Sequence, residues 1–208
     1  MKIIRLVLGA FATNTYIIIS GGQAFVIDPA AEAEKILAVI AENEACLVAV
    51  LLTHGHFDHT SAAQELRLST SAKIYIHEND APMLNDLKKS FASFIPKMFK
   101  PCKADVFLKD GDVINIGGES EESMQMQVVT VPGHSAGSIM YILDDVIFTG
   151  DTLFAGSVGR IDGWGGDGNA QAQSLEKIKA MTGNYRIFPG HGDETTLEIE
   201  KQTNPYLI

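Results

Sequence analysis

The chain has few cysteines and no long apolar run, and each shortage excludes a class of protein. Its 208 residues include two cysteines, Cys46 and Cys102, too few for the disulfide framework of a small secreted domain. No apolar stretch could span a bilayer, and the first residues contain no apolar segment of signal-peptide length. We therefore expect a cytoplasmic protein without a membrane partner. Cys46, in an apolar strand-like run, is expected in the core, and Cys102, in a loop, is expected at the surface.

Basic charge is also scarce. Lysine and arginine number 16 against 26 acids, which gives a net charge of −10. A protein that binds a phosphate backbone needs a basic face, so nucleic acid is excluded as a partner. A small anionic substrate attracted by metal ions remains compatible with this charge. The hydrophobic content of 46% and the length fit a compact enzyme with one domain, residues 1–208.

Histidine is uncommon as well, but three of the six histidines stand close together. The segment from Thr53 to Thr60 follows an apolar run and contains His54, His56, Asp58 and His59. Imidazole nitrogen and carboxylate oxygen are the ligands that zinc and similar divalent ions prefer. An extended backbone would direct His54 and His56 to the same side. Such a cluster can hold more than one metal ion, whereas the ordinary alternative is a polar loop that happens to be rich in histidine.

Three more candidate ligands stand at similar junctions. His134, Asp151 and His191 each follow a strand-like run and are flanked by glycine or proline. Loops at strand ends carry functional side chains, and each residue alone could also belong to an ordinary turn. Three such junctions together favour a shared metal site. His77 alternates with core positions and is predicted to be structural.

The apolar periodicity predicts an α/β fold. Strands are expected at 3–8, 15–20, 23–28, 47–53, 73–77, 124–131, 138–143, 146–149 and 186–188, and helices at 32–44, 61–68 and 170–181. This order predicts two packed sheets with helices outside and with the metal ligands at one edge between the sheets. Residues 86–110 are irregular and contain six lysines and several aromatic residues. They form either a solvated excursion or a mobile wall that recognises an anionic substrate.

The combined motifs resemble those of the metallo-β-lactamase superfamily. The resemblance rests on H-x-H-x-D-H, the distant His134, Asp151 in Gly-Asp-Thr-Leu-Phe, and the final Pro-Gly-His-Gly. Residues 150–160 are similar to the glyoxalase II group. The resemblance implies a four-layer αββα sandwich with two divalent metal ions, zinc foremost and iron or manganese as alternatives. It implies a first metal bound by His54, His56 and His134, a second bound by Asp58, His59 and His191, and Asp151 as a bridge between them.

The resemblance also implies an activity. The expected reaction is hydrolysis of a small-molecule thioester such as S-lactoylglutathione by a metal-bound hydroxide, with Asp58 as the catalytic residue that orients it. The sequence departs from glyoxalase II in the part of the protein that binds glutathione, the thiol portion of the substrate. Glyoxalase II proper has a helical C-terminal domain that contributes much of the glutathione pocket, whereas only residues 192–208 follow His191 here. The glutathione contacts of that domain therefore have no counterpart in this chain.

Other activities on the same fold remain open. A persulfide dioxygenase would use one iron held by His54, His134 and Asp151. A lactonase or a β-lactamase is less favoured. Two-zinc β-lactamases commonly have cysteine where this chain has Asp151, and they are exported.

Overall fold

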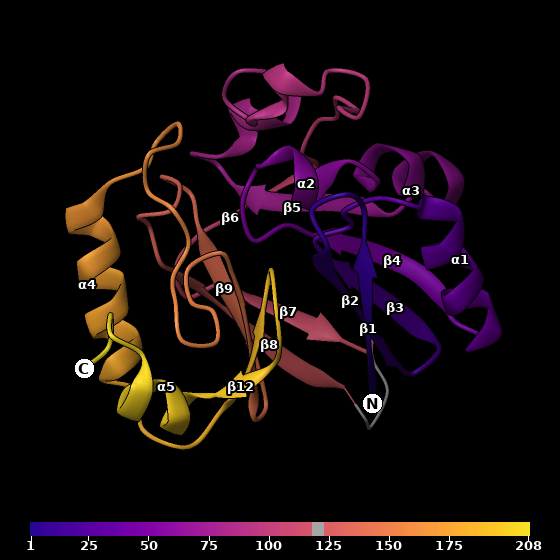
Figure 1. The fold of residues 1–208 in the computed structure, drawn as a ribbon. Helices are drawn as coiled ribbons and strands as arrows, with labels where there is room; N and C mark the ends of the chain where they lie inside the picture. The colour runs from indigo at the N-terminus through magenta and orange to yellow at the C-terminus, as the bar shows by residue number, and fades with distance from the viewer. Residues whose placement is uncertain (118–122) are drawn as a thin grey trace.

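A computed structural model describes residues 1–117 and 123–208, and its strands form two six-stranded sheets (Figure 1). In the first sheet β1-β2-β3 are antiparallel and β3-β4-β5-β6 are parallel. Its strands are β1 (Lys2–Leu8), β2 (Thr13–Ser20), β3 (Gln23–Ile27), β4 (Cys46–Leu51), β5 (Lys73–His77) and β6 (Val106–Leu108). The histidine-rich segment follows β4, which lies inside this sheet.

The second sheet has the order β12-β11-β10-β9-β8-β7. Its pairs are antiparallel except for β10 and β11, which are parallel. The strands are β7 (Val113–Ile116), β8 (Met124–Thr130), β9 (Ile139–Leu143), β10 (Val146–Gly150), β11 (Arg186–Pro189) and β12 (Thr195–Thr196). The parallel pair needs a crossover connection, and α4 supplies it.

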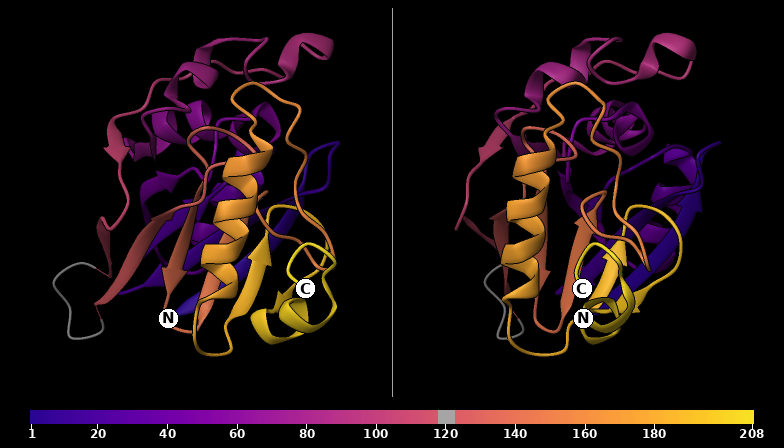
Figure 2. Two further views of the ribbon diagram at one scale, coloured as in Figure 1. Left: turned by 90° about the vertical axis from the view of Figure 1, so that its left-hand side faces the viewer. Right: turned by 60° about the vertical axis from the view of Figure 1, so that its left-hand side comes forward.

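Helices cover the outer face of each sheet. Those on the first sheet are α1 (Ala33–Glu42) and α3 (Ala63–Thr70), and those on the second are α4 (Gly168–Lys179) and α5 (Leu197–Thr203). The short helix α2 (Phe57–Thr60) follows β4 in the chain and precedes α3. Figure 2 shows α4 along the outside of the second sheet. Two 3₁₀ helices are present: η1 (Ala81–Asn85) lies just before the irregular segment 86–110, and η2 (Ala92–Phe94) lies within it. In the described part of the chain, no helix has the length and apolarity needed to cross a membrane.

The apolar runs of the central strands are unbroken because both faces of each sheet are buried. In β2, Ile17 packs with Ile36 of α1 on one face, while Ile18 packs towards Phe148 of the second sheet. In β10, Ile147 turns the other way and joins the cluster under α4. Three apolar layers therefore separate four structural layers. The predicted αββα sandwich is confirmed.

The two cysteine predictions were wrong. Cys46 is exposed, because it begins β4 opposite Gln23 at the rim of the sheet. Cys102 is buried in the apolar cluster of the first sheet, where its backbone N–H donates to the Leu84 carbonyl at 3.0 Å. Burial raises the pKa of the Cys102 thiol to about 11. The segment around Cys102 looks like a loop in the sequence but folds back onto the core.

Candidate metal centre

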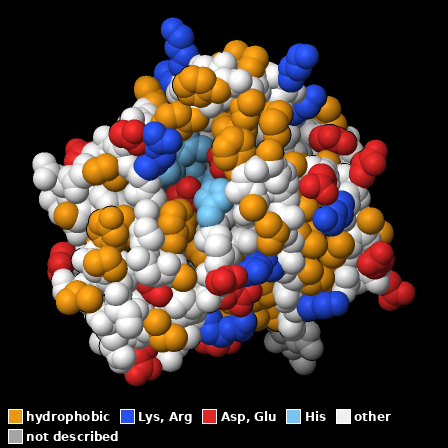
Figure 3. All heavy atoms as spheres, in the orientation of Figure 1, with side chains coloured by type: hydrophobic (Ala, Val, Ile, Leu, Met, Phe, Trp, Pro, Cys, Tyr) orange, Lys and Arg blue, Asp and Glu red, His pale blue; other side chains and the backbone are white. Residues whose placement is uncertain are grey.

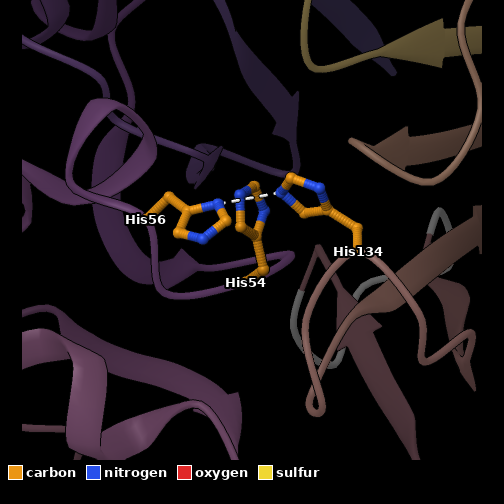
Figure 4. Close-up of side chains that lie close together, drawn as sticks. All are labelled: His54, His56 and His134. Atoms are coloured by element: carbon orange, nitrogen blue, oxygen red, sulfur yellow. Dashed lines mark hydrogen bonds between the residues drawn. The ribbon is translucent and has the colours of Figure 1, made fainter. Parts of the chain in front are cut away.

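Three buried imidazoles form one group of candidate ligands. His54 and His56 follow β4, and His134 comes from the loop between β8 and β9 (Figure 4). One nitrogen of each lies within 4.8 Å of the other two, and His134 Nε2 lies 2.8 Å from His56 Nδ1. Burial and the neighbouring imidazoles hold the pKa values of His54 and His56 well below the usual range. Both rings are therefore neutral, as a metal ligand must be.

A second group contains Asp58 and His59 from α2 and His191 from the loop after β11. His191 Nε2 lies 3.2 Å from His59 Nε2 and 3.4 Å from Asp58 Oδ2. Burial disfavours a charged His59, but the carboxylates around it outweigh burial and raise its pKa to about 10. Burial opposes the charge on Asp58 as well, yet His59 and His191 hold its pKa below the usual range. This group of carboxylates is suited to stabilising positive charge at the site.

Asp151, directly after β10, lies between the two groups. Its Oδ1 is 3.4 Å from His59 Nε2, and its Oδ2 is 3.7 Å from His134 Nε2 and 3.6 Å from His191 Nε2. Within residues 1–117 and 123–208, His54 Nε2 and Asp151 Oδ1 are buried without a hydrogen-bond partner. Buried polar atoms normally have partners. Coordination of divalent metal ions would account for both atoms, so this donor set fits such ions.

Hydrogen bonds on the far side of the rings orient the ligand nitrogens. His134 Nδ1 donates to the Arg160 carbonyl at 2.7 Å, and His191 Nδ1 donates to the Phe11 carbonyl at 3.2 Å. Each bond places the proton on Nδ1 and leaves the Nε2 lone pair directed into the site. Arg160 therefore supports His134 through its backbone carbonyl.

Asp28, which the sequence reasoning missed, connects both groups. Its carboxylate accepts hydrogen bonds from Thr53 N at 2.8 Å, Thr53 Oγ1 at 2.6 Å and His59 Nδ1 at 3.0 Å. Thr53 Oγ1 is in turn 3.0 Å from His54 Nδ1. Asp28 lies near enough to count as a candidate ligand itself, but its oxygens are occupied by these donors. The sequence did contain a signal for Asp28, because it ends an apolar strand just before a proline. Asp151 likewise comes at the end of an apolar strand.

Asp80 was missed as well, and it fastens two of the ligand loops together. Its Oδ2 accepts from Gly55 N at 3.1 Å and Ser135 Oγ at 2.6 Å, and its Oδ1 accepts from Gly137 N at 2.7 Å. Gly55 separates the first two ligand histidines, and Ser135 follows the third. Burial raises the pKa of Asp80, and these three donors oppose that shift. No local pattern distinguishes Asp80, because its donors come from distant segments.

The loop that carries His191 has little room. Asn14 Nδ2 donates to the carbonyls of Pro189 and Gly192, both at 2.9 Å. A Cβ atom on Gly190 would lie 2.7 Å from Cε1 of His59, closer than side chains approach. Gly190, the first glycine of the Pro-Gly-His-Gly motif, is therefore required because the chain approaches the site closely here.

A cavity of about 610 Å³ opens above the candidate ligands. Figure 3 shows histidine and acidic side chains at the bottom of a hollow, with hydrophobic side chains above and to the right of it and basic and acidic ones to the left. Its apolar wall is formed by Phe11, Phe57, Phe91, Phe94 and Ile95, and its remaining charged members are Arg160 and Asp162. Residues 86–110 thus contribute aromatic side chains, and none of their six lysines is among the described lining residues. A second cavity of about 530 Å³, between residues 158–161 and α4, contains none of the seven candidate ligands. His77 also lies outside the described ligand groups, and its Nδ1 accepts from Asn79 N at 3.2 Å.

The sequence matches known proteins over most of its length. The family described as the metallo-β-lactamase superfamily matches residues 8–191. The probable metallo-hydrolase YqgX of Bacillus subtilis is 33% identical over 100% of this chain and 98% of its own length. The hydroxyacylglutathione hydrolase GloC of Haemophilus influenzae is 33% identical over 89% of this chain and 87% of its own.

Solved structures agree with the fold. The B3 metallo-β-lactamase BLEG-1 superposes with a TM-score of 0.89 at 31% identity, covering 99% of each chain. TTHA1623 in a di-iron-bound form gives 0.84 at 33% identity, covering 98% of this chain and all of its own. ETHE1 of Myxococcus xanthus gives 0.82 at 30% identity, covering 99% of this chain and 84% of its own.

Proposed function

The chain belongs to the metallo-β-lactamase superfamily, and we propose that it is a metal-dependent hydrolase whose substrates are small-molecule thioesters such as S-lactoylglutathione. The observation that carries the proposal is the arrangement of seven candidate ligands in two groups with Asp151 between them. The similarity to GloC, named a hydroxyacylglutathione hydrolase, supports the choice of a thioester.

The proposal gives each side chain a task. His54, His56 and His134 would hold one ion, Asp58, His59 and His191 the other, and Asp151 would contact both. When bound, two divalent ions lower the pKa of a water molecule between them and polarise a carbonyl group. Asp58 Oδ2 faces the same space, close to His59 and His191, and would accept a hydrogen bond from the attacking water.

The cavity is consistent with a good leaving group. Besides the candidate ligands, Arg160 and Asp162 are the ionisable side chains among the described lining residues, and they are paired with each other. The described part of the wall therefore offers no free acid to protonate a poor leaving group. A thiolate is stable enough to leave without one, which favours thioesters over amides.

The test combines metal content with activity. Protein purified without added metal is subjected to elemental analysis, then saturated with zinc, iron or manganese and assayed with S-lactoylglutathione. We expect two ions per chain, and one fewer in His191→Ala. His77→Ala is the matched control, because it makes the same change outside the ligand groups and should retain both ions. A fully metallated protein that hydrolyses no thioester would refute the proposal.

The same assay separates the alternatives. A mono-iron persulfide dioxygenase requires only His54, His134 and Asp151, and would consume oxygen with glutathione persulfide while binding one ion. The similarity to BLEG-1 makes a chromogenic β-lactam a necessary substrate in the panel. Thioester hydrolysis without oxygen uptake or β-lactam turnover is the expected result.

A further inference from the structure

Aromatic side chains approach the candidate metal centre from two directions. Phe11 and Phe57 meet edge to face with ring centroids 5.2 Å apart, and the Phe11 carbonyl holds His191. On the other side, the Phe91 ring lies 4.8 Å from the ring of His56. These rings are therefore next to the side chains over which a reacting carbonyl would lie.

The outer part of the wall is apolar and unusually open to solvent. Phe94 is 88% exposed and Phe11 is 50% exposed, and both line the cavity together with Ile95. A grouped set of exposed apolar side chains at a cavity mouth is typical of a binding surface. A ligand with an apolar group would remove this surface from water, which is favourable.

Among the described residues that line it, the wall has no unpaired cation to bind a charged thiol. The Arg160 guanidinium forms two hydrogen bonds with Asp162, at 2.6 and 2.7 Å, and lies 5.1 Å from the centre of the Phe91 ring. Lys89 is directed at the ring of Trp164, 4.8 Å from its centre. The carboxylates of glutathione would thus find no free positive partner among the described lining residues.

We propose that the cavity selects thioesters with an apolar group attached next to the reacting carbonyl, in preference to S-lactoylglutathione. This inference rests on the proposed thioester hydrolysis. In the reaction, the water oxygen bonds to the carbonyl carbon, the carbon–sulfur bond breaks, and the proton goes to the thiolate. The products are a carboxylic acid and a thiol. The apolar group lies on the acyl or the thiol side of that carbon, and in either case contacts Phe91 and Phe94.

The test uses four thioesters, which combine a lactoyl or phenylacetyl group with glutathione or benzyl mercaptan as the thiol. Each kcat/KM is divided by the rate constant for hydroxide hydrolysis of the same compound, which removes differences in intrinsic reactivity. We expect this corrected kcat/KM to be at least about tenfold higher than that of S-lactoylglutathione when one apolar group is introduced. The substitution that gives the larger gain, acyl or thiol, identifies the side on which the group binds.

Two variants locate the effect. Phe94→Ala should reduce the ratio of the corrected kcat/KM of the apolar thioesters to that of S-lactoylglutathione to about threefold or less, mainly through KM of the apolar thioesters. Phe107→Ala is the matched control, because Phe107 is 55% exposed on β6 and does not line the cavity. It should leave all four values unchanged.

Two results overturn the inference for different reasons. If none of the four thioesters is hydrolysed by metal-loaded protein, the proposed function fails and the inference fails with it. If all are hydrolysed but S-lactoylglutathione is equal or better, or Phe94→Ala alters all four alike, only the selectivity is refuted.

Discussion

Replacement of Asp28 by asparagine should weaken the metal centre without changing any ligand. The substitution keeps the size of the side chain, and asparagine tolerates the positive φ of 49° found at this position. The amide oxygen can still accept from Thr53 N. The amide NH₂ group, however, replaces the oxygen that accepts from Thr53 Oγ1 and His59 Nδ1. The buried N–H of His59 then faces another donor.

The size of the effect follows from that lost contact. A hydrogen bond to a charged group contributes roughly 1.5–3 kcal/mol, and an unsatisfied buried donor costs about 1–3 kcal/mol. The Thr53 hydroxyl can rotate to accept from the new NH₂ group, so the loss falls mainly on His59. We expect the free energy of unfolding to fall by roughly 2–4 kcal/mol. In the neutral form that binds metal, His59 could avoid the clash by carrying its proton on Nε2, but that nitrogen is the candidate ligand. Metal affinity should therefore drop about 10- to 100-fold.

The assay is competition with a chromophoric chelator, together with urea unfolding of metal-free protein. The matched control is Asp110→Asn. Asp110 accepts three comparable hydrogen bonds, from Thr130 N, Thr130 Oγ1 and Lys177 Nζ, at the protein surface. It should change metal affinity by less than about twofold. If Asp28→Asn binds two ions as tightly as the wild type, the role assigned to Asp28 is wrong.

Four further predictions concern the ligand-bearing segments and the two cysteines. Asp58→Ala should reduce kcat far more than it changes KM, because its contact with the attacking water is made mainly in the transition state. The measurement is steady-state kinetics at full metal loading, and near-normal turnover would contradict the prediction. Gly190→Ala should abolish binding of at least one ion, because the new methyl group would collide with His59 and Asp151; an unchanged metal content would show that the loop adapts. At pH 8 iodoacetamide should label Cys46 and leave Cys102 unmodified in the folded protein. Mass spectrometry identifies the labelled residue, and labelling of Cys102 in preference to Cys46 would contradict the prediction. Folding raises the pKa of Cys102 from 9.0 to about 11, so the buried thiol stabilises the fold fully below pH 9 and loses this effect between pH 9 and 11. The free energy of unfolding, measured in urea, should therefore fall by about 3 kcal/mol over this range. In a Cys102→Ala variant the free energy of unfolding should fall by less.

The layers of the fold were predictable because the central strands are apolar on both faces. The strands that sequence reasoning missed are short and at or near the sheet edges. Among them, β6 and β7 have few buried positions, so they lack a clear pattern. Helix α5 was missed as well, because it is brief and its buried side chains are few.

The candidate ligands could be found because His134, Asp151 and His191 stand at strand ends beside glycine or proline, and because the other four are clustered directly after an apolar strand. Their role in metal binding stays a prediction, although the fold brings all seven together. Asp28 and Asp80 could not be ranked above other acids, because their importance lies in donors contributed by remote segments. The lysines of residues 86–110 stood out through their charge, whereas Phe91 and Phe94 are the aromatic residues of this segment that face the cavity.

The position of the candidate ligands at the junction of the two sheets has a kinetic consequence. The first sheet supplies four of the ligands, which follow its strand β4: His54, His56, Asp58 and His59. The second sheet supplies the other three from its loops: His134, Asp151 and His191. The site is therefore complete only after the two halves have docked, and contacts this distant in sequence form late in folding. Bound ions would link the two halves and resist their separation during unfolding, but they would contribute little to the step in which the halves first dock. Metal should accordingly slow unfolding and leave the refolding rate almost unchanged, so that the loaded protein persists longer than its equilibrium stability alone suggests.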